Sequence, residues 1–426
     1  MQQTALETGP AIPEEIPQAS ADDIQPIPRI AIQAFCISPD VSAVLEQAST
    51  DRRMARAHMK VHMGGIPAAI DFYQTAPTPN LIVLESKDQA AAIMEQLQQL
   101  SSVCDSGTKV VVIGHTNDVL LYRELLRCGI SEYIVAPITI FDTMRAFGDI
   151  YHDPEAEPLG RTIAFVGAKG GCGSSTVAHN VAWSISSTYQ SNAVVADLDL
   201  AFGTAGLDFN QDPPQGIADA VLSPERVDDM FLERILAKCT DQLSLLAAPS
   251  TLDKTYDFKE NAFESVIEAT RQGVPCVVLD LPHLWTDWMR YTLCAVDDVV
   301  IVAEPDLANL RNAKNLIDLL AQTRPNDAAA KLVINKVGMP KRPEIKPEEI
   351  AASLDLEPVA VLPFDCAVFG TAANNGQMIA ELDPKNQITT QFDFIAQVTT
   401  GRAEINKPKK RSLLPFLEKF TGRKTA

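Results

Sequence analysis

Short runs of consecutive apolar residues, many of them β-branched, recur along the chain and alternate with stretches of helical spacing. A continuous apolar run between turn residues is typical of a strand buried on both faces of a parallel sheet. Seven such runs follow residue 160, at residues 162–166, 193–196, 243–246, 276–279, 299–302, 332–334 and 359–362. Helices are predicted between them, for example at residues 177–186, 226–238, 261–271 and 307–322. This alternation predicts an α/β fold with a doubly wound parallel sheet over residues 161–401.

A smaller domain with the same alternation is predicted before it, over residues 29–150. Its strands are expected at residues 30–37, 80–84, 109–113 and 133–135, with helices at 87–100 and 118–128. Residues 151–160 contain two prolines and several acids and are interpreted as a linker. Residues 1–28 are rich in Pro, Ala, Gln and acids, which predicts a disordered tail.

Composition narrows the class of protein. The 426 residues are 46% hydrophobic, enough for two or three packed domains. The 36 basic and 55 acidic residues give a net charge of −19, which argues against a protein that coats nucleic acid. The eight cysteines are scattered without a C-x-x-C pair, as in a reducing compartment. Because no signal-peptide pattern or membrane-spanning apolar run is present, we expect a cytoplasmic protein.

The candidate chemistry begins with the glycine-rich segment AKGGCGSST at residues 168–176, between a predicted strand and a predicted helix. Glycines let backbone N–H groups converge on an anion, and a helix N-terminus adds unpaired donors. We expect Ser175 to give its hydroxyl to Mg²⁺ and Thr176 to bond a phosphate oxygen. The predicted nucleotide-binding residues of this segment are Gly170, Gly171, Cys172, Gly173, Ser174, Ser175 and Thr176.

The segment departs from the standard phosphate-cradle pattern G-x-x-x-x-G-K-[ST] at two positions. Ala168 replaces the first glycine and Ser174 replaces the lysine, whereas Lys169 lies near the start of the loop. A cradle lysine neutralises charge that grows on the phosphates, and a group of this kind supplies roughly 3 kcal/mol. We therefore expect any hydrolysis of ATP to be weak.

Three acids follow the predicted strands that flank this loop. Asp280 ends the run VVLD, the position of a Walker B carboxylate, and Asp197 and Asp199 follow residues 193–196 as a D-x-D pair. Ligands of open α/β sheets bind at the carboxyl ends of the strands. Asp280 and Asp197, with Ser175, are therefore candidate residues for the Mg²⁺ site. A lone Asp at a strand end is otherwise a helix cap or a turn residue.

The spacing K-G-G-x-G-x-[ST]-[ST] resembles the deviant Walker A loop of the ParA/MinD ATPases. This resemblance implies that Lys169 reaches the nucleotide of a partner subunit across a dimer, and that Asp199 orients the attacking water. It also implies that Asn335, in VINKVG, contacts adenine and that Pro363, in VLPFD, flanks the base.

The first domain resembles a response-regulator receiver, most clearly in GISEYIVAPIT at residues 129–139. A working receiver needs an acidic pair, an acceptor Asp and a late lysine. Here the first strand ends in Phe-Cys-Ile, Glu85 stands at the acceptor position and Ala136 precedes Pro137. We expect a degenerate receiver that is not phosphorylated and serves docking or self-association. Glu85 either mimics a phosphorylated Asp or is a solvated strand-end residue.

A degenerate receiver followed by K-G-G-x-G-S-S-T, AHNVAW and EPDLANLRNAKNLIDLL resembles the CpaE/TadZ pilus-assembly proteins. The resemblance implies an ATP- and Mg²⁺-dependent homodimer that hydrolyses ATP weakly, lies at a cell pole near the inner membrane, and recruits the machinery of a tight-adherence (Flp-type) pilus secretion system. Alternatives are an ATP-gated scaffold without significant hydrolysis and a ParA/MinD-type partitioning or positioning ATPase. An electron-transfer protein like the nitrogenase iron protein would need paired cysteines, and the sequence shows no such pattern.

Residues 402–426 form a basic tail, in which lysines and arginines are concentrated between residues 407 and 424. A basic segment with apolar residues can attach reversibly to an anionic membrane. We expect this tail to contact the inner membrane or an acidic partner. The alternative is a solvated tail that serves solubility.

Overall fold

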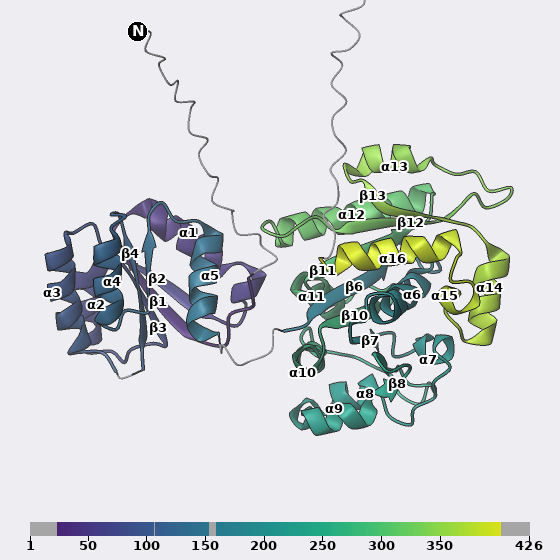
Figure 1. Ribbon diagram of the computed structural model, residues 1–426, viewed down its shortest axis with the longest axis horizontal. Coiled ribbons are helices and arrows are strands. Elements are labelled where there is room, and N and C mark those ends of the chain that lie inside the picture. The colour runs from purple at the N-terminus through teal and green to yellow at the C-terminus, as the bar shows by residue number, and fades with distance from the viewer. Residues whose placement is uncertain (1–23, 106, 153–158, 402–426) are drawn as a thin grey trace, which may run out of the picture. The chain divides into compact units, whose positions relative to one another are not determined.

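The computed structural model describes residues 24–105, 107–152 and 159–401, so the basic tail and most of residues 1–28 lie outside the described residues (Figure 1). The described chain forms two compact units. Unit 1 contains the residues up to Leu159 together with Asp318–Ala329, and unit 2 contains Gly160–Ile317 and the residues from Ala330 on. The predicted α/β class with two parallel-sheet domains is confirmed.

Unit 1 is built on a five-stranded parallel sheet with the strand order β2-β1-β3-β4-β5. Its strands are β1 (Ala31–Cys36), β2 (His58–Met63), β3 (Leu81–Glu85), β4 (Lys109–Gly114) and β5 (Glu132–Val135). Its helices are α1 (Pro39–Ser49), the 3₁₀ helix η2 (Arg52–Met54), α2 (Gly65–Tyr73), α3 (Ala90–Ser101), α4 (Val119–Arg127) and α5 (Ile140–Tyr151). Helices α1 and α5 bury their apolar residues on one face of the sheet, and α2, α3 and α4 bury theirs on the other (Figure 1).

Two details of unit 1 differ from the sequence prediction. Strand β2 was not predicted, because it is an edge strand whose residues are exposed or half-buried and its sequence, HMKVHM, contains no continuous apolar run. The boundary of the disordered tail at residue 28 is also wrong, because Ile24 and Ile27 are buried in the core beside α1 and α5. These two isoleucines are separated by polar and proline-containing sequence, which hides their contribution.

Glu85 is neither solvated nor available at the end of β3. Its side chain is fully buried and accepts hydrogen bonds from the backbone N–H groups of Ile37 and Ser38, at 2.6 and 2.8 Å, and from the hydroxyl of Ser38. His115 Nε2 lies 2.9 Å from its other oxygen. Burial would raise the pKa of Glu85, but these hydrogen bonds hold it below its usual value. The carboxylate therefore fastens the loop after β1, and the expectation of a solvated residue is wrong.

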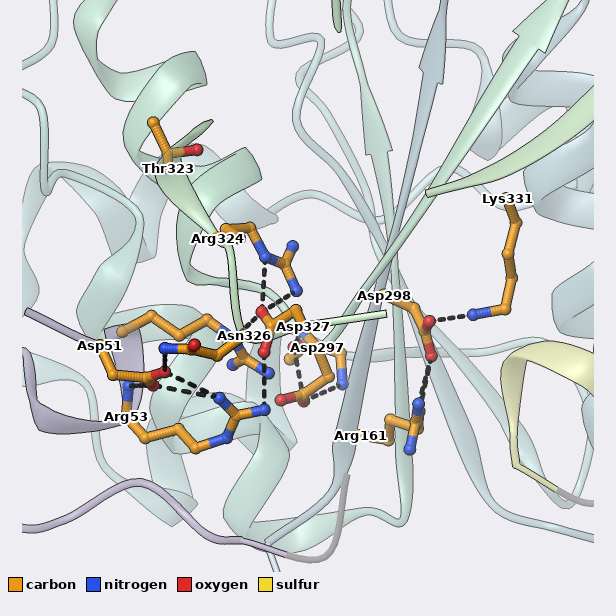
Figure 2. A network of polar contacts seen from close by, with 12 residues as sticks. Asp51, Arg53, Arg161, Asp297, Asp298, Thr323, Arg324, Asn326, Asp327 and Lys331 are labelled. Carbon is orange, nitrogen blue, oxygen red and sulfur yellow. Dashed lines mark hydrogen bonds and ion pairs between the residues drawn. The ribbon is translucent and has the colours of Figure 1, made fainter. Parts of the chain in front are cut away.

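Residues 318–329, which the sequence analysis placed in the larger domain, complete unit 1 through a buried network of charges. Arg53, with a side chain only 1% exposed, donates to Asp51 at 3.0 Å and to Asp327 at 2.6 Å (Figure 2). Asn326 donates to the other oxygen of Asp51, and Arg324 donates to Asp327 at 2.7 Å. Burial would raise the pKa of Asp327, but the surrounding arginines hold it below its usual value.

Replacing Asp327 with Asn should lower the free energy of unfolding of unit 1 by about 3 kcal/mol at pH 7, because a buried guanidinium group loses this carboxylate. Since the pKa of Asp327 is lower in the folded chain, its stabilisation is fully present above the unfolded-state value of about 4 and is lost as the pH falls through the folded-state value. Urea titrations read by hydrogen exchange of β1 peptides, at neutral and acidic pH, measure both effects. The exposed Asp71, changed to Asn, is the matched control, and an equal effect of the two substitutions would contradict the prediction.

Unit 2 contains an eight-stranded sheet with the order β13-β12-β11-β6-β10-β7-β9-β8. Its strands are β6 (Arg161–Gly167), β7 (Ala193–Asp197), β8 (Ala237–Lys238), β9 (Leu243–Leu246), β10 (Cys276–Leu281), β11 (Asp298–Ala303), β12 (Lys331–Val337) and β13 (Pro358–Pro363). All neighbours are parallel except β8, which runs antiparallel to β9. The two residues of β8 fall in the predicted helix 226–238, which is therefore too long; two residues are too few to give a strand pattern.

The helices of unit 2 alternate with these strands. They are α6 (Ser174–Ser187), α7 (Ala205–Asp208), α8 (Ile217–Leu222), the 3₁₀ helix η3 (Pro224–Arg226), α9 (Asp229–Ile235), α10 (Glu264–Gly273), α11 (Asp287–Ala295), α12 (Leu307–Thr323), α13 (Pro347–Leu354), α14 (Cys366–Asn375), α15 (Ile379–Leu382) and α16 (Gln387–Thr399). Helices α6 and α16 pack together over one face of the sheet and share its main core (Figure 1). The last residues of α12 belong to unit 1.

Three neighbouring strands of unit 2 begin with charged residues that neutralise one another. Asp298, at the start of β11, accepts a hydrogen bond from Arg161 of β6 at 2.7 Å and one from Lys331 of β12 (Figure 2). The acid lies on the central strand of the three, so both bases reach it. This arrangement satisfies the buried charges at the amino ends of these strands and leaves the opposite, carboxyl ends for the candidate site.

Candidate functional site

The loop that joins β6 to α6 follows a path that requires glycine. Gly171 has φ of +82° and Gly173 has φ of +90°, a left-handed backbone that disfavours side chains. A Cβ at Gly167 would lie 2.7 Å from the Cys172 sulfur, and one at Gly173 would lie 2.5 Å from Asn335 Nδ2. The glycines of this loop therefore have two functions, backbone conformation and close approach.

The end of β11 holds the inner side of this loop. The carbonyl oxygen of Val302 accepts the N–H of Ala168 at 2.8 Å and lies 3.2 Å from the Cys172 sulfur. Cys172 is buried in the core of unit 2, and burial raises the pKa of its thiol. It is therefore a space-filling residue that anchors the loop, and not a reactive thiolate.

The end of β12 holds the outer side of the loop. Asn335, buried, donates from Nδ2 to the carbonyl oxygen of Cys172 at 2.8 Å, and its Oδ1 accepts the N–H of Lys336. The Lys336 ammonium group donates to the carbonyl oxygen of Gly171 and pairs with Glu304 at 2.8 Å. Both ends of the Asn335 amide are thus used within the protein, so its predicted contact with adenine stays a prediction.

Helix α6 begins directly after the loop, with Ser174, Ser175 and Thr176 in its first turn. The N–H groups of a first helical turn have no acceptor within the helix. Two buried oxygens at this end of the sheet also have no hydrogen-bond partner within the described part of the chain, Ser174 Oγ and Asp280 Oδ1. Unpaired donors beside an unpaired carboxylate oxygen fit a phosphate with its divalent cation.

The structure brings the predicted acids of β7 and β10 together. Asp280 and Asp197 are register partners on neighbouring parallel strands, and both are buried. The two oxygens of Asp197 accept the N–H groups of Asp199 and Ala205, each at 3.1 Å. Burial, followed by the neighbouring Asp280 carboxylate, raises the pKa of Asp197 above its usual range. Asp197 thus holds the chain after β7, and its predicted support of Mg²⁺ stays a prediction.

Asp199 forms a turn at the start of the segment that leads to α7. Its Oδ1 accepts the N–H of Phe202 at 3.0 Å, and its carbonyl oxygen accepts the N–H of Gly203 at 2.7 Å. These are the contacts of an ordinary Asx turn. The predicted function of Asp199, to orient an attacking water, stays a prediction.

His179 is a member of the site whose contacts sequence reasoning missed. It lies in α6, is fully buried, and places Nδ1 2.7 Å from Asp208 Oδ2 and Nε2 3.2 Å from Asp280 Oδ2. Burial alone would lower the pKa of His179, but the two carboxylates outweigh it and raise the pKa to about 10. The bond to Asp208 is what a satisfied structural histidine requires, whereas the contact with Asp280 links His179 to the candidate site.

The side chains of Lys169 and Pro363 lie at the margin of the site. Lys169 is 53% exposed, and its Nζ lies 3.8 Å from an oxygen of Asp306, which is a weak ion pair. Pro363 ends β13 and is the register partner of Val337 in β12. The two residues predicted to contact the base, Asn335 and Pro363, thus lie near the ends of neighbouring strands.

Replacing Gly173 with Ala should destabilise unit 2 by more than the roughly 1 kcal/mol that a left-handed backbone costs an alanine, because the new methyl group would also press on Asn335. Gly338 is the matched control, since it has φ of +84° and no atom within 4 Å of its Cβ position. Urea unfolding of the two variants separates the terms. Equal losses of stability would show that the contact between position 173 and Asn335 does not constrain the loop.

Comparisons with known proteins agree with this geometry, although no protein-family model matches the chain. The septum site-determining protein MinD of Bacillus subtilis (strain 168) is 23% identical over 277 residues, 62% of this chain and 99% of that protein. A ParA family ATPase from Chlorobium tepidum TLS superposes with a TM-score of 0.51 and 22% identity, over 56% of this chain and 98% of that structure.

A solved CpaE pilus assembly protein from Caulobacter crescentus CB15 is 50% identical over 30% of this chain and 98% of that structure, with a TM-score of 0.30. The strand order and the glycine loop thus give this chain the fold of the ParA/MinD-like P-loop proteins. Solved structures similar to this chain thus include CpaE pilus assembly proteins, the resemblance that the sequence predicted. Among the described residues, no helix is both long and apolar enough to span a membrane.

Proposed function

We propose that this chain binds ATP and Mg²⁺ and acts as a nucleotide-gated dimer that recruits the machinery of a tight-adherence (Flp-type) pilus secretion system, with weak hydrolysis. The observation that carries the nucleotide site is the glycine loop with two unpartnered buried oxygens beside it, Ser174 Oγ and Asp280 Oδ1. The pilus role is supported by the 50% identity to a CpaE pilus assembly protein. Action at a cell pole near the inner membrane belongs to the same proposal.

Different residues of the loop would hold the phosphates and the cation. Backbone N–H groups from Gly170 to Ser174 and the hydroxyl of Thr176 would hold the phosphates. The Ser175 hydroxyl and the free oxygen of Asp280 would hold the cation. Mg²⁺, when bound, supplies positive charge that stabilises the β- and γ-phosphate oxygens. Lys336 and Asn335 keep the loop open to the ligand by fastening the carbonyl groups of Gly171 and Cys172.

The weak hydrolysis follows from the missing cradle lysine. Ser174 offers a neutral hydroxyl group where a standard loop offers an ammonium group, at a cost of roughly 3 kcal/mol in stabilisation of the transferred phosphoryl group. Lys169 is half exposed and only weakly paired, so it is available to a second copy of the chain. In the proposed dimer each copy supplies Lys169 to the nucleotide of the other.

An exposed apolar set surrounds the same end of the sheet and fits a second copy. Phe202 follows β7 and is 74% exposed, Trp285 follows β10 and is 55% exposed, and Leu307 follows β11 and is 73% exposed. These three strands lie within two positions of β6 in the sheet. Large apolar side chains gathered around a binding site are typical of a surface that becomes buried in an assembly.

Replacing Ser175 with Ala should weaken binding of Mg²⁺-ATP about tenfold or more, because the cation loses a first oxygen ligand. Isothermal titration calorimetry measures the affinity with Mg²⁺ and again with a chelator, where the two proteins should bind alike. Ser187, an exposed residue at the end of the same helix, gives the control Ser187→Ala. Equal affinity of Ser175→Ala and the control would overturn the nucleotide site.

Replacing Lys169 with Ala should abolish the dimer that a slowly hydrolysed ATP analogue induces, while nucleotide binding by the single chain persists. Light scattering coupled to gel filtration measures the mass with and without the analogue. Lys238→Ala, at another exposed lysine of unit 2, should dimerise like the wild type. Ser174→Lys offers a further arm, because a lysine within the loop should raise turnover and make it independent of Lys169. The dimer model fails if Lys169→Ala still dimerises.

A second candidate, an ATP-gated scaffold without significant hydrolysis, is favoured by one observation. Asp199 is the residue expected to orient the attacking water, but its Oδ1 already accepts a hydrogen bond from the N–H of Phe202. A turnover assay on the dimer distinguishes the two functions: release of phosphate that stops in Asp199→Asn supports hydrolysis, and no release above background supports the scaffold. A ParA/MinD-type positioning ATPase would share the nucleotide chemistry and differ in its partner.

In this proposal, unit 1 provides the contacts with partner proteins. Its acceptor position is occupied by Glu85, which is already bonded on both oxygens, so phosphorylation has no place in its function. We infer that unit 1 serves docking to the pilus machinery or self-association. The contact of the basic tail with an anionic membrane or an acidic partner lies outside the described residues and remains part of the proposal.

A further inference from the structure

His179 joins two elements that are distant in sequence and carries a contact that core packing does not require. Its ring lies between Asp208, the last residue of α7, and Asp280 of β10, and it packs against Phe209 with ring centroids 5.4 Å apart. The side chain is 0% exposed. A buried imidazole that served only to fill space would face apolar neighbours, whereas each nitrogen of His179 faces a carboxylate oxygen.

The two contacts of His179 differ in quality. Nδ1 makes a hydrogen bond of 2.7 Å with Asp208 Oδ2. Nε2 lies 3.2 Å from Asp280 Oδ2 as an ion pair, but without the alignment of a hydrogen bond, so neither Nε2 nor Asp280 Oδ1 has a hydrogen-bond partner in the described chain. Asp208 therefore holds the imidazole firmly, and the carboxylate of Asp280 is the adjustable member of the pair.

The unpartnered Asp280 Oδ1 is the oxygen left for a cation. A carboxylate has two oxygens, and the neighbour that attracts one of them determines which way the other points. His179 attracts Oδ2, so Oδ1 remains the oxygen that a metal ion can take. The imidazole thus faces one oxygen of the carboxylate and leaves the other for the cation.

The other end of the link lies in the segment that follows β7. Asp199 begins a turn there, Asp197 holds the N–H groups of Asp199 and Ala205, and Asp208 ends α7. The segment also bears the exposed Phe202 of the proposed dimer surface. Through Asp208 and His179, any movement of the Asp280 carboxylate reaches this segment directly.

We propose that His179 is a positioning residue that orients the Asp280 carboxylate toward the divalent cation and links it through Asp208 to the segment from Asp199 to Asp208, so that binding of Mg²⁺-ATP orders this segment. The proposal rests on the proposed nucleotide site. A residue that only packs in the core would have neither of two effects that we assign to His179. The first is that Mg²⁺ increases the affinity for the nucleotide, and the second is that Mg²⁺-ATP protects the peptide from Asp199 to Asp208 against hydrogen exchange.

The test uses His179→Asn in the full chain, with ATP titrated calorimetrically in Mg²⁺ and in a chelator. We expect the affinity in the chelator to stay within about twofold of the wild type, and the gain from Mg²⁺ to fall about tenfold or more, as for other residues that orient a metal ligand. Hydrogen exchange of the peptide from Asp199 to Asp208 should slow when Mg²⁺-ATP is added to the wild type and should not slow in the variant.

Asp208→Asn is the second variant, and it decides the question if His179→Asn does not fold. It leaves the Asp280 carboxylate in place, so most of the gain from Mg²⁺ should remain while the protection of the peptide is lost. Asp241→Asn, at an almost fully exposed aspartate, is the matched control. If His179→Asn or, in its place, Asp208→Asn retains full protection of the peptide, the positioning role is wrong although the nucleotide site stands. If the wild type gains no affinity from Mg²⁺, the proposed function itself fails.

Discussion

The ends of β11 and β12 hold the loop between β6 and α6 in place through hydrogen bonds. The carbonyl oxygen of Val302 accepts a hydrogen bond from the N–H of Ala168, and the side-chain amide of Asn335 donates one to the carbonyl oxygen of Cys172. A glycine-rich loop has high conformational entropy when free, so these fixed contacts are what make its path reproducible. The start of α6 and the burial of Cys172 both depend on them.

The two parallel sheets differ in how the carboxylates at the carboxyl ends of their strands are bonded. In unit 1 the buried carboxylate of Glu85, at the end of β3, accepts hydrogen bonds from the loop after β1. In unit 2 Gly171 and Gly173 adopt a left-handed backbone at this edge, and Asp280 Oδ1 has no hydrogen-bond partner among the described residues. One fold class thus has its buried carboxylate satisfied by the chain in unit 1 and leaves a buried carboxylate oxygen for a ligand in unit 2.

The sequence predicted the central strands well, because strands that are buried on both faces consist of continuous apolar runs. It missed β2, whose mixed sequence suits a half-exposed edge, and β8, which is too short to have a pattern. It located the glycine loop between β6 and α6, and Asp280 in β10, because both lie in local motifs. It could not find the contact of His179 with Asp280, or of Arg53 with Asp327, since each joins residues far apart in sequence and no local spacing encodes it.

The return of residues 318–329 to unit 1 makes that unit discontinuous, and this has a consequence for how the protein is made. A chain leaving the ribosome presents Arg53 long before it presents Asp327. The core of unit 1 can collapse as soon as β5 and α5 have emerged, but its buried guanidinium group receives its last carboxylate only after β6 to β11 have been synthesised. Unit 1 is therefore completed late, and a fragment that ends at residue 159 lacks the acid that its buried arginine requires.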